Sequence, residues 1–178
     1  LASQNGFSPL NQSLSVGNSS CISLIMEGNW LKAPWPAHVR LGEGILLGRN
    51  VLTNEPLPGT SQAAFRLSGE VIEVGKKPST PRGTPGQNAF SDSRPFKDYG
   101  NHTRVVMALG RQDVGAGTIY PLDPNLEVMG MTSDHTVLAV KGVGKAPKVG
   151  QSLTFGLDYG ALLGVMTSPY VHKIIRAQ

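Results

Sequence analysis

Glycine and proline recur in clusters along this chain of 178 residues, which contains 22 glycines and 13 prolines. Both residue types punctuate turns, so a chain rich in them forms short elements joined by turns rather than a helical bundle. Hydrophobic residues make up 39% of the chain and charged residues 16%, which is typical of globular rather than disordered proteins. The pattern predicts a largely β architecture, with enough chain to bury a hydrophobic core.

The remaining composition narrows the class of protein. The formal net charge of +4 is mild and spread along the chain, so we interpret Lys76-Lys77 and the scattered arginines as solvated surface rather than a nucleic-acid-binding face. The lone cysteine, Cys21, forms no disulfide within the chain, and its apolar neighbours favour a small buried side chain over a nucleophile. No apolar run approaches the roughly 18 residues of a membrane span, and no secretory signal is visible. We therefore expect a cytoplasmic protein without a membrane partner.

Up to about residue 51, the chain repeats a strand, a glycine turn and a short helix. Strands are predicted at 14–16 and 38–41, and short helices at 21–26 and 45–47. Two such units in succession are typical of proteins in which strands and helices alternate.

After a bridge at 52–63, the chain alternates strand patterns with turns. The predicted strands are 65–74, 104–109, 126–131, 136–140, 152–157 and 170–175, and one helix is predicted at 160–166. A long loop rich in proline and glycine separates the first two strands, at 76–99. A loop of that length in a compact domain is usually functional or faces a partner.

The two glycine turns of the first region are candidates for an anion site. A turn between a strand and a helix presents backbone N–H groups at the positive end of the helix dipole. Asn18-Ser19-Ser20 adds hydroxyl donors, and Gly42-Glu43-Gly44 allows a phosphate to approach the backbone closely. Two adjacent turns of this kind can converge on one phosphate. The alternative is that both are ordinary capped loops; an imperfect dinucleotide-binding pattern through Gly48 is disfavoured.

Other polar residues are candidates for binding or catalysis. Arg40 ends a predicted strand, so its side chain would bind a carboxylate, a phosphate or a ring nitrogen, or form a surface salt bridge. Ser133-Asp134-His135 suggests a hydrolase triad, but neighbouring residues of a strand point to opposite faces, so Asp134 is badly placed to orient His135. The remaining histidines lack the spacing of metal ligands, and no metal site is predicted.

Several blocks of the sequence stand in a characteristic order and spacing. They are residues 15–20 (SVGNSS), 39–44 (VRLGEG), 110–114 (GRQDV), 133–135 (SDH), 158–163 (DYGALL) and 166–171 (MTSPYV). Together they resemble the C-terminal half of pyridoxal-phosphate-dependent amino-acid racemases of the alanine/ornithine racemase family. The resemblance implies that residues 1–52 are the C-terminal end of a cofactor-binding (β/α)8 TIM barrel. It implies that residues 53–178 form a mainly antiparallel, barrel-like β domain.

The resemblance also implies which residues hold pyridoxal 5'-phosphate. The residues that match the family's cofactor site are Asn18, Ser19, Ser20, Arg40, Gly42, Glu43 and Tyr159. The serines, the turn at Gly42 and Tyr159 would hold the phosphate. Arg40 would face the pyridine nitrogen and keep it unprotonated, because two positive charges repel in a dry site.

Catalysis in the family moves the α-proton of a free amino acid through a Schiff base. The Schiff-base lysine is expected upstream of Leu1, so we expect a fragment that lacks an N-terminal barrel half, and no racemisation by this chain alone. The backbone N–H of Ser133 matches the group that meets the substrate carboxylate, and a homodimer with shared active sites is implied. The family's catalytic tyrosine aligns with Arg111, which is a poor acid/base because arginine stays protonated. Asp113 and His135 are the other candidates for that role.

Two alternatives from other functional classes remain. One is a non-catalytic pyridoxal-phosphate carrier or regulatory protein that keeps the phosphate-binding turns. The other is an interaction module formed by the β domain, in which the two strand–helix units are purely structural. The substrate of the complete racemase is expected to be alanine, ornithine or another basic amino acid.

Overall fold

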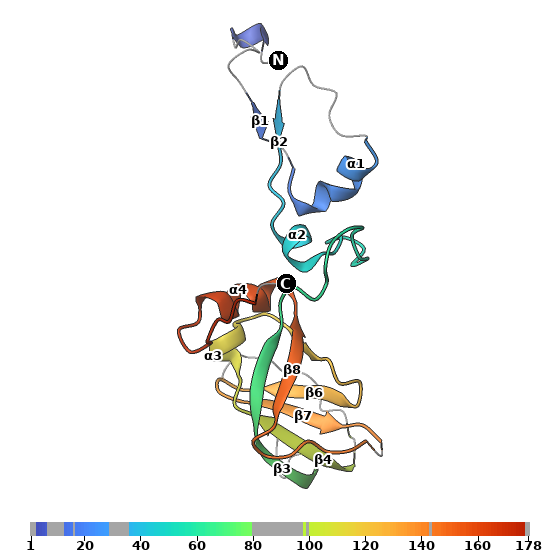
Figure 1. Cartoon of the computed structure of the whole chain (residues 1–178), viewed down its shortest axis with the longest axis vertical. Helices are drawn as coiled ribbons and strands as arrows, with labels where there is room; N and C mark the ends of the chain where they lie inside the picture. Colours follow the sequence, from blue (N-terminus) through green and yellow to red (C-terminus); the bar gives the residue numbers. More distant parts are fainter. Residues whose placement is uncertain are drawn as a thin grey trace. The chain divides into compact units, whose positions relative to one another are not determined.

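The computed structural model describes residues 3–6, 13–15, 17–28, 36–79, 98, 100–142 and 144–176. The chain divides into two compact units, Leu1–Phe65 and Arg66–Gln178, which we call unit 1 and unit 2. Figure 1 shows the elements of each unit.

Unit 1 contains the two strand–turn–helix repeats that the sequence predicts. Its elements are η1 (Ser3–Asn5), β1 (Leu14–Ser15), η3 (Ser19–Cys21), α1 (Ile22–Met26), β2 (Ala37–His38) and α2 (Glu43–Leu47). Strands β1 and β2 pair in parallel, with Leu14 opposite Ala37 and Ser15 opposite His38. Strand β2 ends at His38, three residues before the predicted end, and Val16 lies outside the described residues.

Unit 2 is built around one antiparallel sheet of six strands. Its elements are β3 (Leu67–Pro78), β4 (Asn101–Met107), α3 (Arg111–Val114), β5 (Ile119–Pro121), β6 (Leu126–Met131), β7 (Thr136–Val140), β8 (Ser152–Leu157) and α4 (Tyr159–Thr167). The strand order is β5-β8-β3-β4-β7-β6. Strands β5 and β6, at the two ends of this order, also approach each other. The sheet is therefore a nearly closed barrel, which confirms the predicted barrel-like β fold.

The long strand β3 joins the two parts of this sheet. Its first residues, Leu67–Glu70, pair with β8, whereas Val71–Pro78 pair with β4. The register with β4 shifts between Val71 and Glu73. Such a bulge bends a strand and increases its twist, so β3 can serve two neighbours along its length (Figure 1).

The hydrophobic core of unit 2 lies inside the curved sheet. Val71, Val105, Met107, Leu138 and Phe155 are completely buried. They come from β3, β4, β7 and β8, and in β3 and β4 they alternate with more exposed residues. This alternation is what a sheet with one buried face requires.

Helices α3 and α4 pack against each other at one end of the sheet (Figure 1). A Cβ atom added to Gly164 of α4 would lie 2.6 Å from the carbonyl oxygen of Val114 in α3. The two helices therefore touch through their backbones. Ala161, Leu162 and Val165 of α4 are buried in the same region.

Strands 126–131, 136–140 and 152–157 agree residue by residue with the prediction, and the predicted helix at 160–166 is confirmed as α4.

Two expectations about the secondary structure were wrong. Residues 170–175 form no strand, because nothing in the described part of the chain pairs with them. Lys76 and Lys77 belong to β3 rather than to a loop, because their backbone pairs with β4. The rest of the predicted loop, Lys97 included, lies almost wholly outside the described residues.

Candidate functional site

In unit 1, the turn before η3 is closed by Asn18. Its side-chain Oδ1 accepts hydrogen bonds from the backbone N–H of Ser20 (2.9 Å) and from the Ser20 hydroxyl (2.5 Å). Asn18 is thus the N-cap of η3, as residues of its type often are. Both donors of Ser20 are consequently engaged with Asn18.

Ser19 joins the first turn to the second. Its side chain is buried, and its Oγ accepts a hydrogen bond from the backbone N–H of Gly44 at 3.2 Å. A hydroxyl has one proton to donate beside its acceptor lone pairs, so Ser19 can still donate to another group. A Cβ at Gly44 would approach the Cβ of Ser19 to 3.6 Å and the carbonyl oxygen of Arg49 to 3.4 Å. The two predicted turns therefore lie against each other, with Gly42 and Glu43 at the start of α2.

Arg40 lies just after β2 and is exposed. Its Nη1 donates to the hydroxyl of Ser15 at 3.2 Å, and its backbone N–H donates to the carbonyl of Gly17 at 3.3 Å. The segments after β1 and β2 are thus connected through both backbone and side chain. This contact orients the guanidinium, and the sequence did not indicate Ser15 as its partner.

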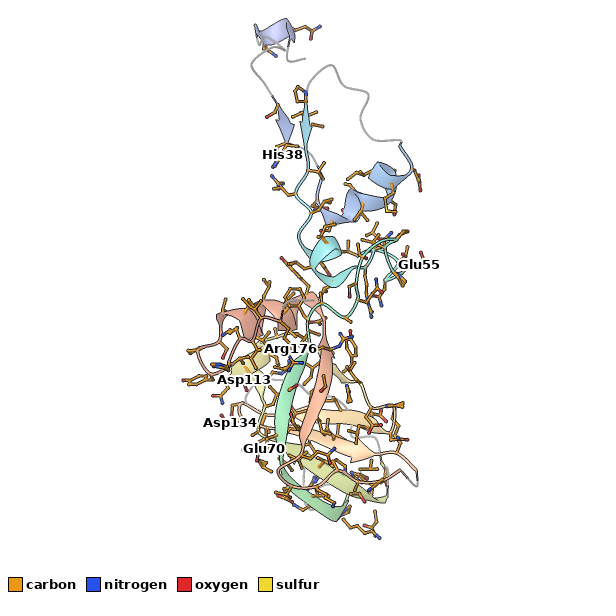
Figure 2. All side chains as sticks on the ribbon, viewed as in Figure 1. His38, Glu55, Glu70, Asp113, Asp134 and Arg176 are labelled. Carbon is orange, nitrogen blue, oxygen red and sulfur yellow. The ribbon has the colours of Figure 1, made fainter. Side chains whose placement is uncertain are left out.

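In unit 2, Asp113 is committed to its own helix. Its carboxylate is buried, and Oδ2 accepts from the backbone N–H of Gly110 at 2.9 Å. Figure 2 labels Asp113 and Asp134 on the same side of this unit. An acidic side chain that returns to the N-cap backbone stabilises the first turn of a helix. Asp113 therefore has a structural partner at the position where the sequence suggests an acid/base.

The segment around Ser133 is held against the start of α3. The backbone N–H groups of Arg111 and Gln112 donate to the carbonyls of Thr132 (2.9 Å) and Ser133 (3.0 Å). A Cβ at Gly110 would lie only 2.3 Å from the carbonyl oxygen of Ser133. The structure therefore brings Arg111, Asp113 and Ser133 together.

His135 and Ser133 lie on a tight turn between β6 and β7. The backbone of His135 bonds to Thr132 in both directions, because its N–H donates to Thr132 Oγ1 and its carbonyl accepts from the Thr132 N–H. The Ser133 hydroxyl donates to the carboxylate of Asp134 at 2.9 Å, and both of these residues are exposed. His135 itself is half-buried.

Tyr159 is the first residue of α4, and it is half-buried. The residue before it, Asp158, is the N-cap, and sequence analysis did not single it out. Its Oδ1 accepts from Ala161 N–H at 2.7 Å, and its Oδ2 accepts from Thr118 N–H at 2.9 Å. An aspartate directly before an apolar helical run is the signal that could have identified this cap.

Two other kinds of site are absent from the described residues. Those residues contain no group of three or more His, Cys, Asp and Glu side chains that could hold a metal ion. No helix within the described ranges has both the length and the apolar composition needed to cross a membrane.

Two proteins of known activity are similar to this chain in sequence. An ornithine racemase of Acetoanaerobium sticklandii is 37% identical over 160 residues, which are 90% of this chain and 45% of that protein. A lysine racemase of Thermotoga maritima is 41% identical over 136 residues, 76% of this chain and 38% of that protein. The chain thus spans less than half the length of both relatives. No family model matches it.

A solved structure shares the fold. The D-threonine aldolase from Filomicrobium marinum superposes with a TM-score of 0.52 at 13% identity, over 85% of this chain and 34% of that one. At this level of identity the likeness concerns the fold alone.

Proposed function

The chain is a member of the alanine/ornithine racemase family and covers its C-terminal part, and on this premise we propose that it belongs to a pyridoxal-phosphate-dependent racemase. The observation that carries the proposal is the 37% identity to an ornithine racemase over 160 residues. Both similar enzymes bear the names of basic amino acids, so the proposed substrate is a free basic amino acid such as ornithine or lysine.

The turns of unit 1 fit the phosphate of pyridoxal 5'-phosphate. A phosphate needs several hydrogen-bond donors and little steric bulk around it. Ser19 retains a hydroxyl proton while its oxygen accepts from Gly44, and the backbone at Gly42 and Glu43 begins the adjacent helix α2. Ser20 would have to exchange its bonds with Asn18 for bonds to the phosphate. Ser19 is therefore the stronger candidate of the two serines.

The bound cofactor would withdraw electrons from the substrate and so weaken the bond to its α-proton. Arg40, oriented by Ser15, would face the pyridine nitrogen, and Tyr159 would reach the phosphate. The Schiff-base lysine would belong to a part of the complete enzyme that this chain does not match. The exchangeable proton on the other face of the substrate needs a group that can both lose and regain it near neutral pH.

Among the three candidates for that second acid/base, we favour His135. A guanidinium is a poor acid/base near neutral pH, and the carboxylate of Asp113 already accepts from Gly110. A histidine changes charge near neutral pH, and His135 lies beside Ser133, whose backbone N–H would meet the substrate carboxylate. In the proposed homodimer, Ser133 and His135 would serve the partner's site.

A chimaera of the Thermotoga maritima lysine racemase tests the proposal. This chain would replace the matching part of that enzyme, and exchange of the substrate α-hydrogen with deuterium oxide would be followed by NMR. We expect exchange with lysine or ornithine, and weaker binding of pyridoxal phosphate after Ser19→Ala. Ser68→Ala, at an exposed position of β3, is the matched control. A folded, cofactor-loaded chimaera that exchanges no amino acid would refute the proposal.

A further inference from the structure

Residues 115–118, between α3 and β5, are anchored on one side by Arg111. Its Nη1 donates to the carbonyl oxygens of Gly115 (3.1 Å) and Gly117 (2.9 Å). Hydrogen bonds from a charged donor are stronger than neutral ones, and a cation is favoured at the C-terminal end of a helix. The guanidinium of Arg111 therefore holds the backbone that leaves α3.

The same segment is anchored on its other side by Asp158. One carboxylate oxygen accepts from Thr118 N–H at 2.9 Å, and the other accepts from Ala161 N–H at 2.7 Å. The backbone N–H of Asp158 also donates to the carbonyl of Thr118 at 3.0 Å. A single side chain thus ties this segment to the first turn of α4, which begins at Tyr159.

Close backbone packing leaves little slack between these parts. A Cβ added to Gly117 would lie 1.8 Å from the backbone nitrogen of Ala161. Protein interiors are closely packed, so a displacement of one part is transmitted to its neighbours. A shift of Gly117 must therefore move the start of α4 or break its contacts.

We propose that Arg111 is a positioning residue, which acts through Gly117, Thr118 and Asp158 to set the position of Tyr159. The inference rests on the proposed function, in which Tyr159 reaches the cofactor phosphate. It gives Arg111 a role that requires no proton transfer, at the position where the family resemblance places an acid/base. Arg111 serves the site through two carbonyl oxygens of its own chain.

The test compares Arg111→Met with Arg111→Lys in the complete chain. Methionine removes the donors at similar length, whereas lysine keeps an ammonium that reaches the same carbonyls. Arg176→Met, at an exposed position, is the matched control. NMR would measure amide hydrogen exchange at Thr118 and Ala161, together with the ring signal of Tyr159, which is assigned with Tyr159→Phe.

For Arg111→Met we expect exchange at both amides to accelerate by about tenfold or more, as for the loss of charge-assisted hydrogen bonds. The ring signal of Tyr159 should shift, and Arg111→Lys should restore it. The control should leave both unchanged. Unchanged α4 amides and an unchanged ring signal in Arg111→Met would overturn the inference.

A double-mutant cycle with Asp158→Ala tests whether the two anchors act as one pathway. Because both hold the same segment, the combined variant should accelerate exchange at Ala161 by less than the product of the single effects. A multiplicative effect would show that Arg111 does not act through Asp158. If Arg111→Met fails to fold, Arg111→Gln takes its place, because it removes the positive charge of the donor and keeps a polar side chain; unchanged exchange at Ala161 in that variant would likewise overturn the inference.

Titration of the wild-type chain with pyridoxal 5'-phosphate separates the two proposals. A Tyr159 ring signal that does not change when the cofactor is added would count against the proposed function of Tyr159. The double-mutant cycle, measured by amide hydrogen exchange, tests whether Arg111 positions α4, and it requires no ligand.

Discussion

Asn18, Asp113 and Asp158 show at the residue scale how a polar side chain can be committed to nearby backbone. Asn18 accepts two bonds from Ser20, Asp113 accepts from Gly110, and Asp158 bonds to both Thr118 and Ala161. The sequence identifies the first two as candidate site residues because their types suit binding and catalysis. It does not reveal their partners, because partners depend on how the turns fold.

Glu73 and Lys77 of β3 form an ion pair on the surface of unit 2. The hydrogen bond from Lys77, and then its positive charge, lower the pKa of Glu73, and Arg104 contributes in the same direction. A lowered pKa in the folded state stabilises the fold above the pKa of the unfolded state. That stabilisation is lost as the pH falls through the folded pKa.

Lys77→Met should therefore raise the pKa of Glu73, measured by carboxyl ¹³C NMR as a function of pH. Because the pair stabilises the fold only at higher pH, the variant should also lose less stability than the wild type when the pH is lowered. Lys76→Met, at the neighbouring position of the same strand, is the control and should leave the titration of Glu73 in place. Equal shifts in the two variants would mean that general surface charge, rather than the pair, sets this pKa.

At the scale of elements, the strands that lie between clear turn signals were predictable. Strands β6, β7 and β8 match their predicted bounds because each combines a buried face with clear turn signals at its ends. Strand β5 was missed because its three residues include Pro121 and carry no period. The wrong strand at 170–175 has suitable residues, but strand formation also requires a neighbour, which local sequence does not encode.

The close contact between residues 115–118 and α4 leads to a prediction about Gly117. Gly117→Ala should lower the free energy of unfolding by about 3 kcal/mol, near the upper end for overpacking. The physical reason is that the new methyl group would overlap the backbone of Ala161. Denaturant unfolding followed by circular dichroism measures the change.

Gly130→Ala in β6 is the matched control, because a Cβ there meets no atom within 4 Å. Its effect should stay within about 0.5 kcal/mol, as for surface substitutions. A Gly117→Ala variant as stable as this control would show that the loop before β5 can move away from α4 at little cost.

At the scale of the whole molecule, the buried apolar side chains are unevenly distributed. Among the described residues, only Ile22 and Leu57 of unit 1 are buried apolar side chains, and all the others lie in unit 2. Unit 1 also exposes Leu24, Ile45 and Leu52. Burial of apolar surface is the main source of stability, so the main stabilising core formed by the described residues is that of unit 2.

Residues 66–178 expressed alone should therefore fold. The strand amides of this shorter protein should resist hydrogen exchange as strongly as they do in the complete chain. Within the complete chain, the amides of unit 1 should exchange faster than those of unit 2. NMR or mass spectrometry can compare the two proteins. Loss of protection in β3, β4 and β8 of the shorter protein would show that unit 2 depends on unit 1.

The candidate site residues are grouped within each unit, although their roles stay predictions. Ser19 and the turn at Gly42 come together in unit 1, and Arg111, Asp113 and Ser133 come together in unit 2. The contact between Asp158 and Thr118 was not predictable, because it joins residues 40 positions apart. Only the folded chain shows which carboxylate meets which amide.

Strand β3 pairs with β8 through one part and with β4 through another, and this sets the order in which strands can pair during synthesis. A chain that emerges from the ribosome N-terminus first can pair Val71–Pro78 with β4 once Met107 has left the ribosome. Residues 67–70 must wait for β8, which is produced after every other strand of the sheet. Until then they present an open strand edge, and open edges are where nascent chains pair wrongly with one another. Translation of the last strand therefore ends the period in which this β domain is most exposed to aggregation.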